Sequence, residues 1–288
     1  MKVGTTLPQF RDEADSALAV ARRAEDAGLD GVFVFDHLWP LGRPDRPALH
    51  SLVLLGAVAA STSRVVVGPL VARVGMLPDA VLVHALVSLH RMAGGRVVVT
   101  LGTGDRANRP ENLAYGLDYP PAAERIAHLL ECCRALKRAG VATWVGGLSV
   151  AVRDVAARAD GWNAWGVDVD TFATGVVALR QAASVLGEES GADAPLSVAG
   201  NARPRPQASW GGQVLIGRTP GEAAEKLARH GDRPGLVHGT VDDLARHLRA
   251  LADAGAAWAM CAPLDVGTDP RAVEYLADAA VAARATRR

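Results

Sequence analysis

The sequence predicts one closed (β/α)8 barrel, an α/β fold of the TIM type, extending over residues 1–288 as a single domain. Short apolar runs, typical of parallel strands that are buried on both faces, alternate with longer segments of helical periodicity. A length of 288 residues accommodates one barrel with its surrounding helices. No linker or change of composition divides the chain, so an open, doubly wound sheet is the less economical alternative.

In the first half of the chain each predicted strand is followed by a predicted helix. Residues 2–6 form the first apolar run. Residues 12–27 then carry apolar side chains three or four positions apart, Leu18 and Ala21 among them, and this segment stops before Gly28. The same reasoning predicts strands at 31–35, 64–68, 96–101 and 142–145, and helices at 48–60, 78–92 and 121–138.

The second half of the chain continues the alternation less regularly. The segment 201–212 contains Pro204, Pro206 and two glycines, which predicts a long loop. The remaining predicted elements are helices at 149–159, 169–186, 219–230, 240–254 and 270–284, and strands at 161–165, 195–199 and 257–261. These strands complete the set of eight that the barrel requires.

The composition excludes several classes of partner. Because 31 basic residues balance 31 acidic ones, no net positive field favours nucleic acid or an anionic membrane. Residues 1–13 contain no apolar signal segment and no stretch has the length of a membrane span, so we expect a cytoplasmic protein. The adjacent Cys132 and Cys133 suit a reducing compartment and make a poor chelate, so we predict no metal site.

The active site of such a barrel forms where the strands end, so the residues at those positions are the candidates. They are Asp36, His37 and Trp39 after the second strand, Gly102, Gly104 and Asp105 after the fourth, Gly146 and Gly147 after the fifth, and Trp162 in the sixth. Two of them have structural alternatives: Asp36 could cap the next turn, and His37 could be a surface histidine.

The glycines at 102 and 104 belong to a pattern that has two interpretations. Residues 102–107 match the loose dinucleotide-binding pattern G-x-G-x-x-A. However, Pro110 and Gly116 interrupt the helix that a Rossmann loop would open, and no acidic residue ends the following strand. We therefore interpret the glycines as positions where a flat ligand lies against bare backbone.

The chain resembles the bacterial-luciferase-like family of flavin and deazaflavin oxidoreductases over nearly its whole length. Each matching segment is short, and their order and spacing together carry the resemblance. The segments are residues 3–8, 24–37, 62–68, 95–104, 111–116, 144–147, 159–162 and 239–244. Within this family the chain is most similar to members that use the deazaflavin coenzyme F420, on residues 214–224, 235–240 and 254–258.

The resemblance implies a set of residues around the cofactor ring and its side chain. They are Asp36, Leu70, Val71, Gly102, Gly104, Asn108, Val145, Gly146 and Gly147. It also implies a non-proline cis peptide bond near Leu70–Val71. Arg73, Arg106 and Arg109 are candidate contacts for the phosphate and the acidic tail of the cofactor.

The implied chemistry is hydride transfer between F420 and a small organic substrate, which also requires a group that manages one proton. His37 is the predicted acid or base, because imidazole titrates near neutral pH. Asp105 is the predicted partner in proton transfer, although the most similar relatives carry a glutamate there. Trp39 and Trp162 are predicted walls of the substrate pocket.

Two other functions stay open on the same fold. One is an FMN-dependent monooxygenase that receives reduced flavin from a separate reductase, and the other is a flavin-binding barrel without turnover. The resemblance and the apolar residues 52–60 predict a homodimer. Ala139 and Gly140 form only a short connection after Arg138, where relatives carry a longer segment that covers the site. The substrate itself is therefore not predicted.

Overall fold

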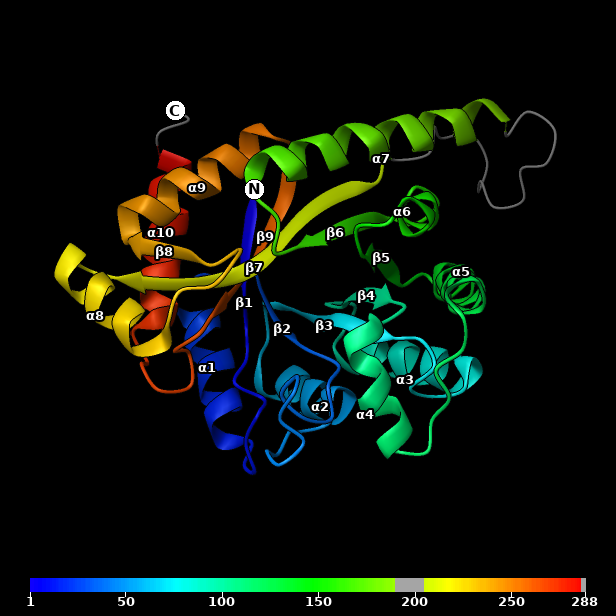
Figure 1. The fold of residues 1–288 in the computed structure, drawn as a ribbon, viewed down its shortest axis with the longest axis horizontal. Helices are drawn as coiled ribbons and strands as arrows, with labels where there is room; N and C mark the ends of the chain where they lie inside the picture. The colour runs from blue at the N-terminus through cyan, green and yellow to red at the C-terminus, as the bar shows by residue number, and fades with distance from the viewer. Residues whose placement is uncertain (190–204, 286–288) are drawn as a thin grey trace.

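A computed structural model describes residues 1–189 and 205–285 and shows a parallel barrel surrounded by helices (Figure 1). The strands are β1 (Lys2–Thr6), β2 (Gly31–Val34), β3 (Val66–Arg73), β4 (Val98–Gly102), β5 (Ala142–Gly146), β6 (Gly161–Trp165), β7 (Gln207–Gly217), β8 (Val237–Thr240) and β9 (Ala256–Pro263). The helices are α1 (Asp15–Asp26), α2 (Ser51–Ser61), α3 (Asp79–Met92), the 3-10 helix η1 (Arg106–Asn108), α4 (Arg109–Ala114), α5 (Ala122–Arg138), α6 (Val150–Ala156), α7 (Val169–Glu189), α8 (Pro220–His230), α9 (Val241–Asp253) and α10 (Ala272–Ala285).

Eight of the strands close the barrel, which confirms the predicted fold class. Strands β1 to β6 pair in order, β6 pairs with β7, β7 with β9, and β9 with β1, all in parallel. Strand β8 lies outside this ring. It pairs with residues 214–217 of β7, beyond the part of β7 that contacts β6. The barrel thus has a short parallel extension at one side of the mouth formed by the strand ends (Figure 1).

The seventh strand differs from the prediction. The strand predicted at 195–199 lies outside the described residues, and the loop predicted at 201–212 is wrong from Gln207 onward, where β7 begins. The glycines in this segment serve packing. A Cβ atom on Gly211 would lie 2.6 Å from Cε3 of Trp165, and one on Gly212 would lie 2.3 Å from Cζ2 of Trp210. Tryptophan rings therefore occupy the space of the missing side chains. Strand β8 was not among the predicted strands.

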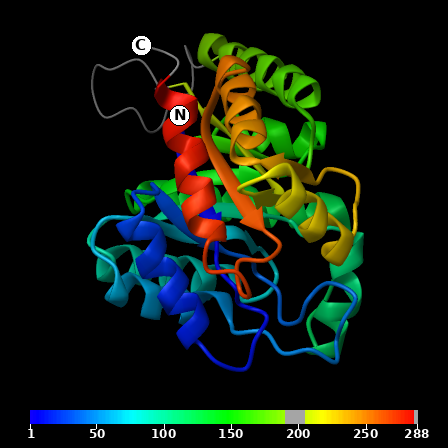
Figure 2. The same ribbon diagram turned by 90° about the vertical axis from the view of Figure 1, so that its left-hand side faces the viewer.

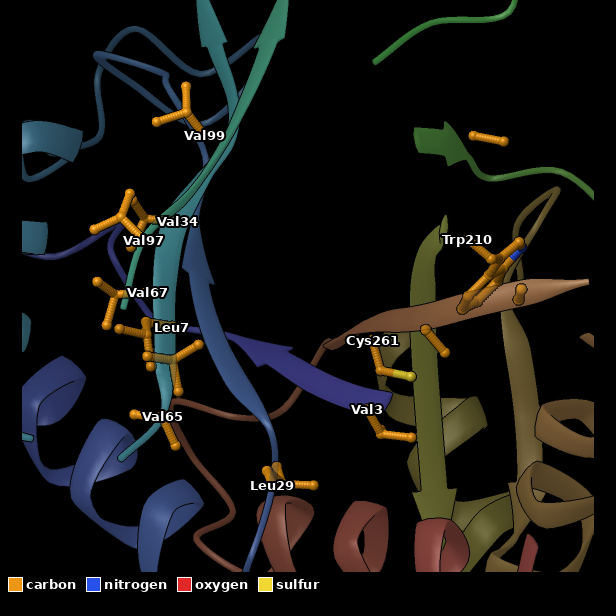
Figure 3. Close-up of a cluster of buried hydrophobic side chains, with 14 of the residues drawn as sticks. Val3, Leu7, Leu29, Val34, Val65, Val67, Val97, Val99, Trp210 and Cys261 are labelled. Carbon is orange, nitrogen blue, oxygen red and sulfur yellow. The ribbon is translucent and has the colours of Figure 1, made fainter. Parts of the chain in front are cut away.

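The apolar side chains form two cores. The larger core lies between the strands and the helices, and Figure 3 shows part of it, where Val34, Val67 and Val99 come from three neighbouring strands. The smaller core fills the barrel itself with side chains from β2, β3, β5 and β9. Its buried members are Phe33, Leu70, Trp144, Trp258 and Met260. Because these rings fill the lower barrel, a ligand has room only toward the mouth.

The helices form one continuous layer around the barrel. Helices α1 and α10, from the two ends of the chain, lie side by side (Figure 2), and Arg23 Nη1 lies 2.8 Å from Glu274 Oε1 across them. Within residues 1–189 and 205–285, no helix combines the length and the apolar character that crossing a bilayer requires.

The packing of His247 in α9 predicts a loss of stability in mild acid. Its ring lies 5.0 Å from that of Trp210, and its buried Nε2 has no hydrogen-bond partner among the described residues. Burial lowers the pKa of His247 below the ordinary 6.5. The unfolded chain therefore binds a proton more readily, and stability falls as pH drops through about 6.5. Urea unfolding of His247→Phe between pH 7.5 and 5.5 should show a weaker pH dependence than that of the wild-type protein. Equal slopes would contradict this origin.

Candidate active site

Three side chains that are distant in the sequence form a network of contacts at the barrel mouth. His37 follows β2, Arg73 ends β3, and Glu111 lies in α4. His37 Nδ1 lies 3.1 Å from Glu111 Oε2, and Arg73 Nη1 lies 3.0 Å from the same oxygen. The other Glu111 oxygen accepts a hydrogen bond from the backbone N–H of Leu38. The carboxylate thus holds both the ring and the backbone of the segment after β2.

Glu111 is ionised in this arrangement although it is only 1% exposed. Burial acts to raise its pKa, but the hydrogen bonds from His37 and Leu38 and the charge of Arg73 outweigh it and keep the pKa below the ordinary value. An ionised carboxylate at Nδ1 favours the tautomer that carries its proton there. Nε2 of His37 is then the nitrogen that can accept or donate a proton.

Glu111 lies in the segment 111–116 that carries part of the family resemblance, but its position in the sequence predicted no role for it. Its signal was weak, because one acidic residue in a short helix is normally exposed. Arg73 was proposed as a contact for an anionic cofactor tail, but it is 4% exposed and paired with Glu111. Its Nε and Nη2 atoms are buried without a hydrogen-bond partner among the described residues.

Asp36 connects two strands and a helix. One carboxylate oxygen accepts a hydrogen bond of 2.7 Å from the Ser51 hydroxyl at the start of α2, and the other accepts one of 2.8 Å from the backbone N–H of Arg73. Both oxygens are therefore engaged by the protein. Asp36 thus fixes the end of β3 relative to the segment that carries His37, and neither of these bonds caps the next turn.

The cis peptide bond implied by the resemblance is present at Leu70–Val71, where the pairing of β3 with β4 also shifts register. The Val71 side chain lies against the bare faces of two glycines from β4 and β5. A Cβ atom on Gly102 would lie 2.5 Å from Cγ2 of Val71, and one on Gly146 would lie 2.5 Å from Cγ1. The glycines therefore make room for Val71, which itself forms an apolar surface at the mouth.

Adding one methyl group at Gly146 tests this packing. We expect Gly146→Ala to lower the free energy of unfolding by about 1–3 kcal/mol, because the new Cβ must displace Val71. Gly56→Ala in α2 is the matched control, since no atom lies within 4 Å of its Cβ position, and it should raise stability by about 0.5–1 kcal/mol. The double variant Gly146→Ala/Val71→Ala should recover part of the loss in thermal melts. A full loss in the double variant would show that Val71 is not the obstacle.

Asp105 and Asn108 hold a turn together. The Asp105 carboxylate accepts a hydrogen bond of 2.8 Å from the backbone N–H of Ala107, while Asn108 Oδ1 accepts one of 2.7 Å from the N–H of Asp105. This reciprocal cap begins η1, and Gly104 precedes it with a φ of +67°. Asp105 is exposed and the structure shows no contact between it and His37. The acid that the structure places beside His37 is Glu111.

The aromatic residues at the mouth are only partly those predicted. The Trp39 ring lies 5.5 Å from that of Tyr115, at the edge of the site. Trp162 is a correction: its ring is buried against Phe172 of α7 and its Nε1 donates a hydrogen bond of 2.7 Å to Gly147 O. Side chains alternate along a strand, so the mouth receives Trp165 in its place. The Asn163 side chain faces the barrel interior, where it contacts Met260. Trp165 lies two residues further along β6 and therefore on the same face of the strand.

Two predicted cofactor contacts at the end of β5 are directed elsewhere. The Val145 side chain belongs to the core between the strands and the helices. The N–H of Gly147 donates to Asn163 O at 3.1 Å, and its carbonyl accepts from Trp162. Gly146 thus supplies the bare face in this region, and it does so to Val71.

A pocket of about 260 Å³ lies against the segment after β2. Its walls include Leu38, Leu52, Leu82, Tyr115 and Asp36.

Among the described residues, no group of three or more His, Cys, Asp or Glu side chains is placed to hold a metal ion.

Comparison with known proteins shows what the first half of the chain is similar to. Residues 1–140 match the model of the luciferase-like monooxygenases, a segment that includes His37, Arg73 and Glu111. The F420-dependent glucose-6-phosphate dehydrogenase of Kineococcus radiotolerans is 38% identical over 119 residues, which are 41% of this chain and 34% of that protein. The enzyme of the same name from Nakamurella multipartita is 39% identical over 125 residues, 43% of this chain and 35% of that protein. The matched segment thus spans about a third of each relative.

Solved structures match the fold over almost the whole chain. An F420-dependent secondary alcohol dehydrogenase in complex with an F420-acetone adduct has a TM-score of 0.78 at 15% identity, covering 98% of this chain and 99% of that one. EDTA monooxygenase from Chelativorans sp. BNC1 has a TM-score of 0.78 at 14% identity, covering 100% and 94%. Residues 1–140 of this chain are therefore similar to the luciferase-like monooxygenases, and the chain has the barrel fold of these solved neighbours.

Proposed function

We propose that this protein is an enzyme that transfers hydride between coenzyme F420 and a small organic substrate. The observation that carries the proposal is the network of contacts among His37, Glu111 and Arg73 at the barrel mouth. In this network Glu111 orients His37 as a proton acceptor, and Val71 forms an apolar surface at the same mouth. The similarity of the first half of the chain to F420-dependent dehydrogenases supports the choice of cofactor.

The residues at the mouth fit a flat aromatic ring. Val71 lies over Gly102 and Gly146 and presents an apolar surface on which such a ring could rest, and Gly104 keeps the adjacent turn free of a side chain. These residues would hold the ring of F420. When bound, a deazaflavin of this kind supplies a carbon that accepts or releases two electrons as hydride.

The protein's own contribution is the placement of one proton. During oxidation of an alcohol, His37 Nε2 is positioned to take the hydroxyl proton as the hydride leaves the neighbouring carbon, and in the reverse reaction it returns that proton. Glu111 stabilises the imidazolium that forms, because its charge faces Nδ1. Arg73 lies behind the carboxylate and keeps it charged and in place.

Cofactor titrations test the proposal. The purified protein should bind F420 in the micromolar range or tighter, and should reduce it with an alcohol or a sugar phosphate from a substrate panel. His37→Ala should retain F420 binding and lose turnover. Micromolar affinity for FMN without any binding of F420 would overturn the proposal.

An FMN-dependent monooxygenase is the second candidate, because EDTA monooxygenase shares the fold. It would require a reductase that supplies reduced flavin. Consumption of oxygen that depends on reduced FMN, with no reaction of F420, would establish this function.

We also propose that the protein is a homodimer. Val53 of α2 and Val81 of α3 expose 73% and 50% of their surface, which leaves an apolar face on these adjacent helices. Val53→Lys should shift the protein from dimer to monomer in sedimentation velocity. A monomeric wild-type protein at micromolar concentration would refute the proposal.

A further inference from the structure

Two aromatic rings meet across the barrel mouth. Phe35 follows β2 and Trp165 ends β6, and the ring centroids lie 5.4 Å apart with the planes at 88°. In the closed barrel, β2 and β6 are opposite each other, because four strand pairings separate them in either direction. A contact between these two strands therefore spans the mouth. Both side chains are half-buried, so they still expose aromatic surface.

The Phe35 end of this bridge is held by its neighbours. The buried Gln9 side chain clamps the backbone of Phe35, donating a hydrogen bond of 2.8 Å to its carbonyl and accepting one of 2.5 Å from its N–H. The Phe10 ring lies nearly parallel to that of Phe35, with centroids 6.3 Å apart. The position of Phe35 is thus set by the segment after β1.

The Trp165 ring packs against a glycine of β7. A side chain at Gly211 would overlap the Trp165 ring, since its Cβ would lie 2.6 Å from Cε3. Gly166 N–H also donates to Gly211 O at 2.8 Å, which fixes the chain directly after the tryptophan. The two rings are therefore parts of a preorganised surface, in which little side-chain freedom remains to be lost when a ligand binds.

Phe35 and Trp165 together form a layer of aromatic side chains across the mouth, which we call the aromatic floor. Below it, the barrel is filled by Phe33, Trp144 and Trp258. His37 follows Phe35 by two residues, so both belong to the segment after β2. Aromatic rings that keep exposed surface are suited to contact with another planar ring.

We propose that Phe35 and Trp165 are the residues on which a planar tricyclic ring rests, and that they determine how deeply it enters the barrel. The proposal rests on the proposed function for the identity of the ring as a deazaflavin. Val71 forms one side of the same surface, while the floor prevents the ring from reaching the barrel interior.

The test is to measure binding of two probes to matched variants. The probes are F420 and lumichrome, a tricyclic ring without a phosphate tail. Trp165→Ala and Phe35→Leu should each weaken binding of both probes by at least about fivefold, the lower end of what loss of one stacked ring causes. Trp165→Phe should bind nearly as the wild-type protein does. Phe172→Leu, the same change at a buried ring away from the mouth, should leave both affinities unchanged.

The outcomes separate this inference from the proposed function. Thermal melts first establish that each variant is folded. Unchanged or tighter F420 binding in Trp165→Ala and Phe35→Leu would overturn the inference and leave the proposed function standing. Binding of lumichrome but not of F420 by the wild-type protein, with loss of lumichrome binding in Trp165→Ala, would support the floor and refute the F420 function. Binding of neither probe would refute both.

Discussion

Lys226→Met should lower the free energy of unfolding by about 3–5 kcal/mol, because it leaves a buried carboxylate without its counter-charge. Lys226 of α8 is nearly fully buried. Its Nζ lies 2.6 Å from Asp265 Oδ2, 2.9 Å from Asp269 Oδ2 and 2.9 Å from the carbonyl of Ile216. These contacts connect α8, the end of β7 and the segment after β9. Chemical unfolding at pH 7 measures the effect.

Two variants control for the loss of a lysine in general. Arg134→Met removes an exposed ion pair with Glu131 and should change stability by less than about 1 kcal/mol. Lys226→Met/Asp265→Leu removes both buried charges and should recover part of the loss. If Lys226→Met is no more destabilising than Arg134→Met, the buried pair does not stabilise the fold.

The pH dependence of the Lys226 effect has a definite sign. Hydrogen bonds from Arg271 and Lys226 hold the pKa of Asp269 below its ordinary 3.8. The contribution of this carboxylate is therefore complete above about pH 4 and is lost as pH falls further. Although burial opposes it, the two aspartates raise the pKa of Lys226 above 10.5, so its contribution is lost only at strongly alkaline pH. The difference between variant and wild type should be constant from pH 5 to pH 9 and shrink in stronger acid.

Glu111→Gln should lower kcat/KM by about 10²–10⁴-fold, with the substrate that the cofactor screen identifies. The amide keeps the size of the side chain but loses the charge that faces His37 Nδ1 at 3.1 Å. It no longer favours the Nδ1–H tautomer, and it leaves Arg73 without its ion-pair partner. F420 affinity should change much less than kcat. Nitrogen NMR of His37 should show a larger share of the Nε2–H tautomer in the variant.

Asp105→Asn distinguishes the two acids at the site. The structure predicts less than about a threefold change in kcat/KM, since Asp105 caps η1 and Glu111 contacts His37. The sequence alone predicted Asp105 as the proton-transfer partner. A loss in Asp105→Asn that matches the loss in Glu111→Gln would restore that assignment.

Much of the barrel could be predicted from the sequence because strands and helices leave local patterns. The predicted strand at 161–165 and the predicted helix at 121–138 agree with β6 and α5 to within one residue. The prediction failed at β7, where Gly211 and Gly212 indicated a loop. Their role depends on the rings of Trp165 and Trp210, and glycines that make room for a ring look in sequence like glycines in a loop.

The site was predicted in part for the same reason. Strand ends located His37 and Asp36 at the mouth, and the family resemblance implied the cis bond at Leu70–Val71. Glu111 was not found, because it lies 74 residues from His37 and no local pattern connects them. Trp162 was assigned to the pocket in place of Trp165, because both are aromatic and only the alternation of side chains along β6 separates them.

The sequence by itself determined that the chain forms a parallel barrel, where most of its strands end, and that a histidine follows the second strand. Apolar periodicity and glycine positions are properties of short segments, so they can be read without the rest of the chain. Only the tertiary structure decided that Glu111 and Arg73 orient His37, that Val71 fills the glycine faces, and that Phe35 meets Trp165. These contacts join residues that are distant in the sequence, and only the folded barrel brings them together.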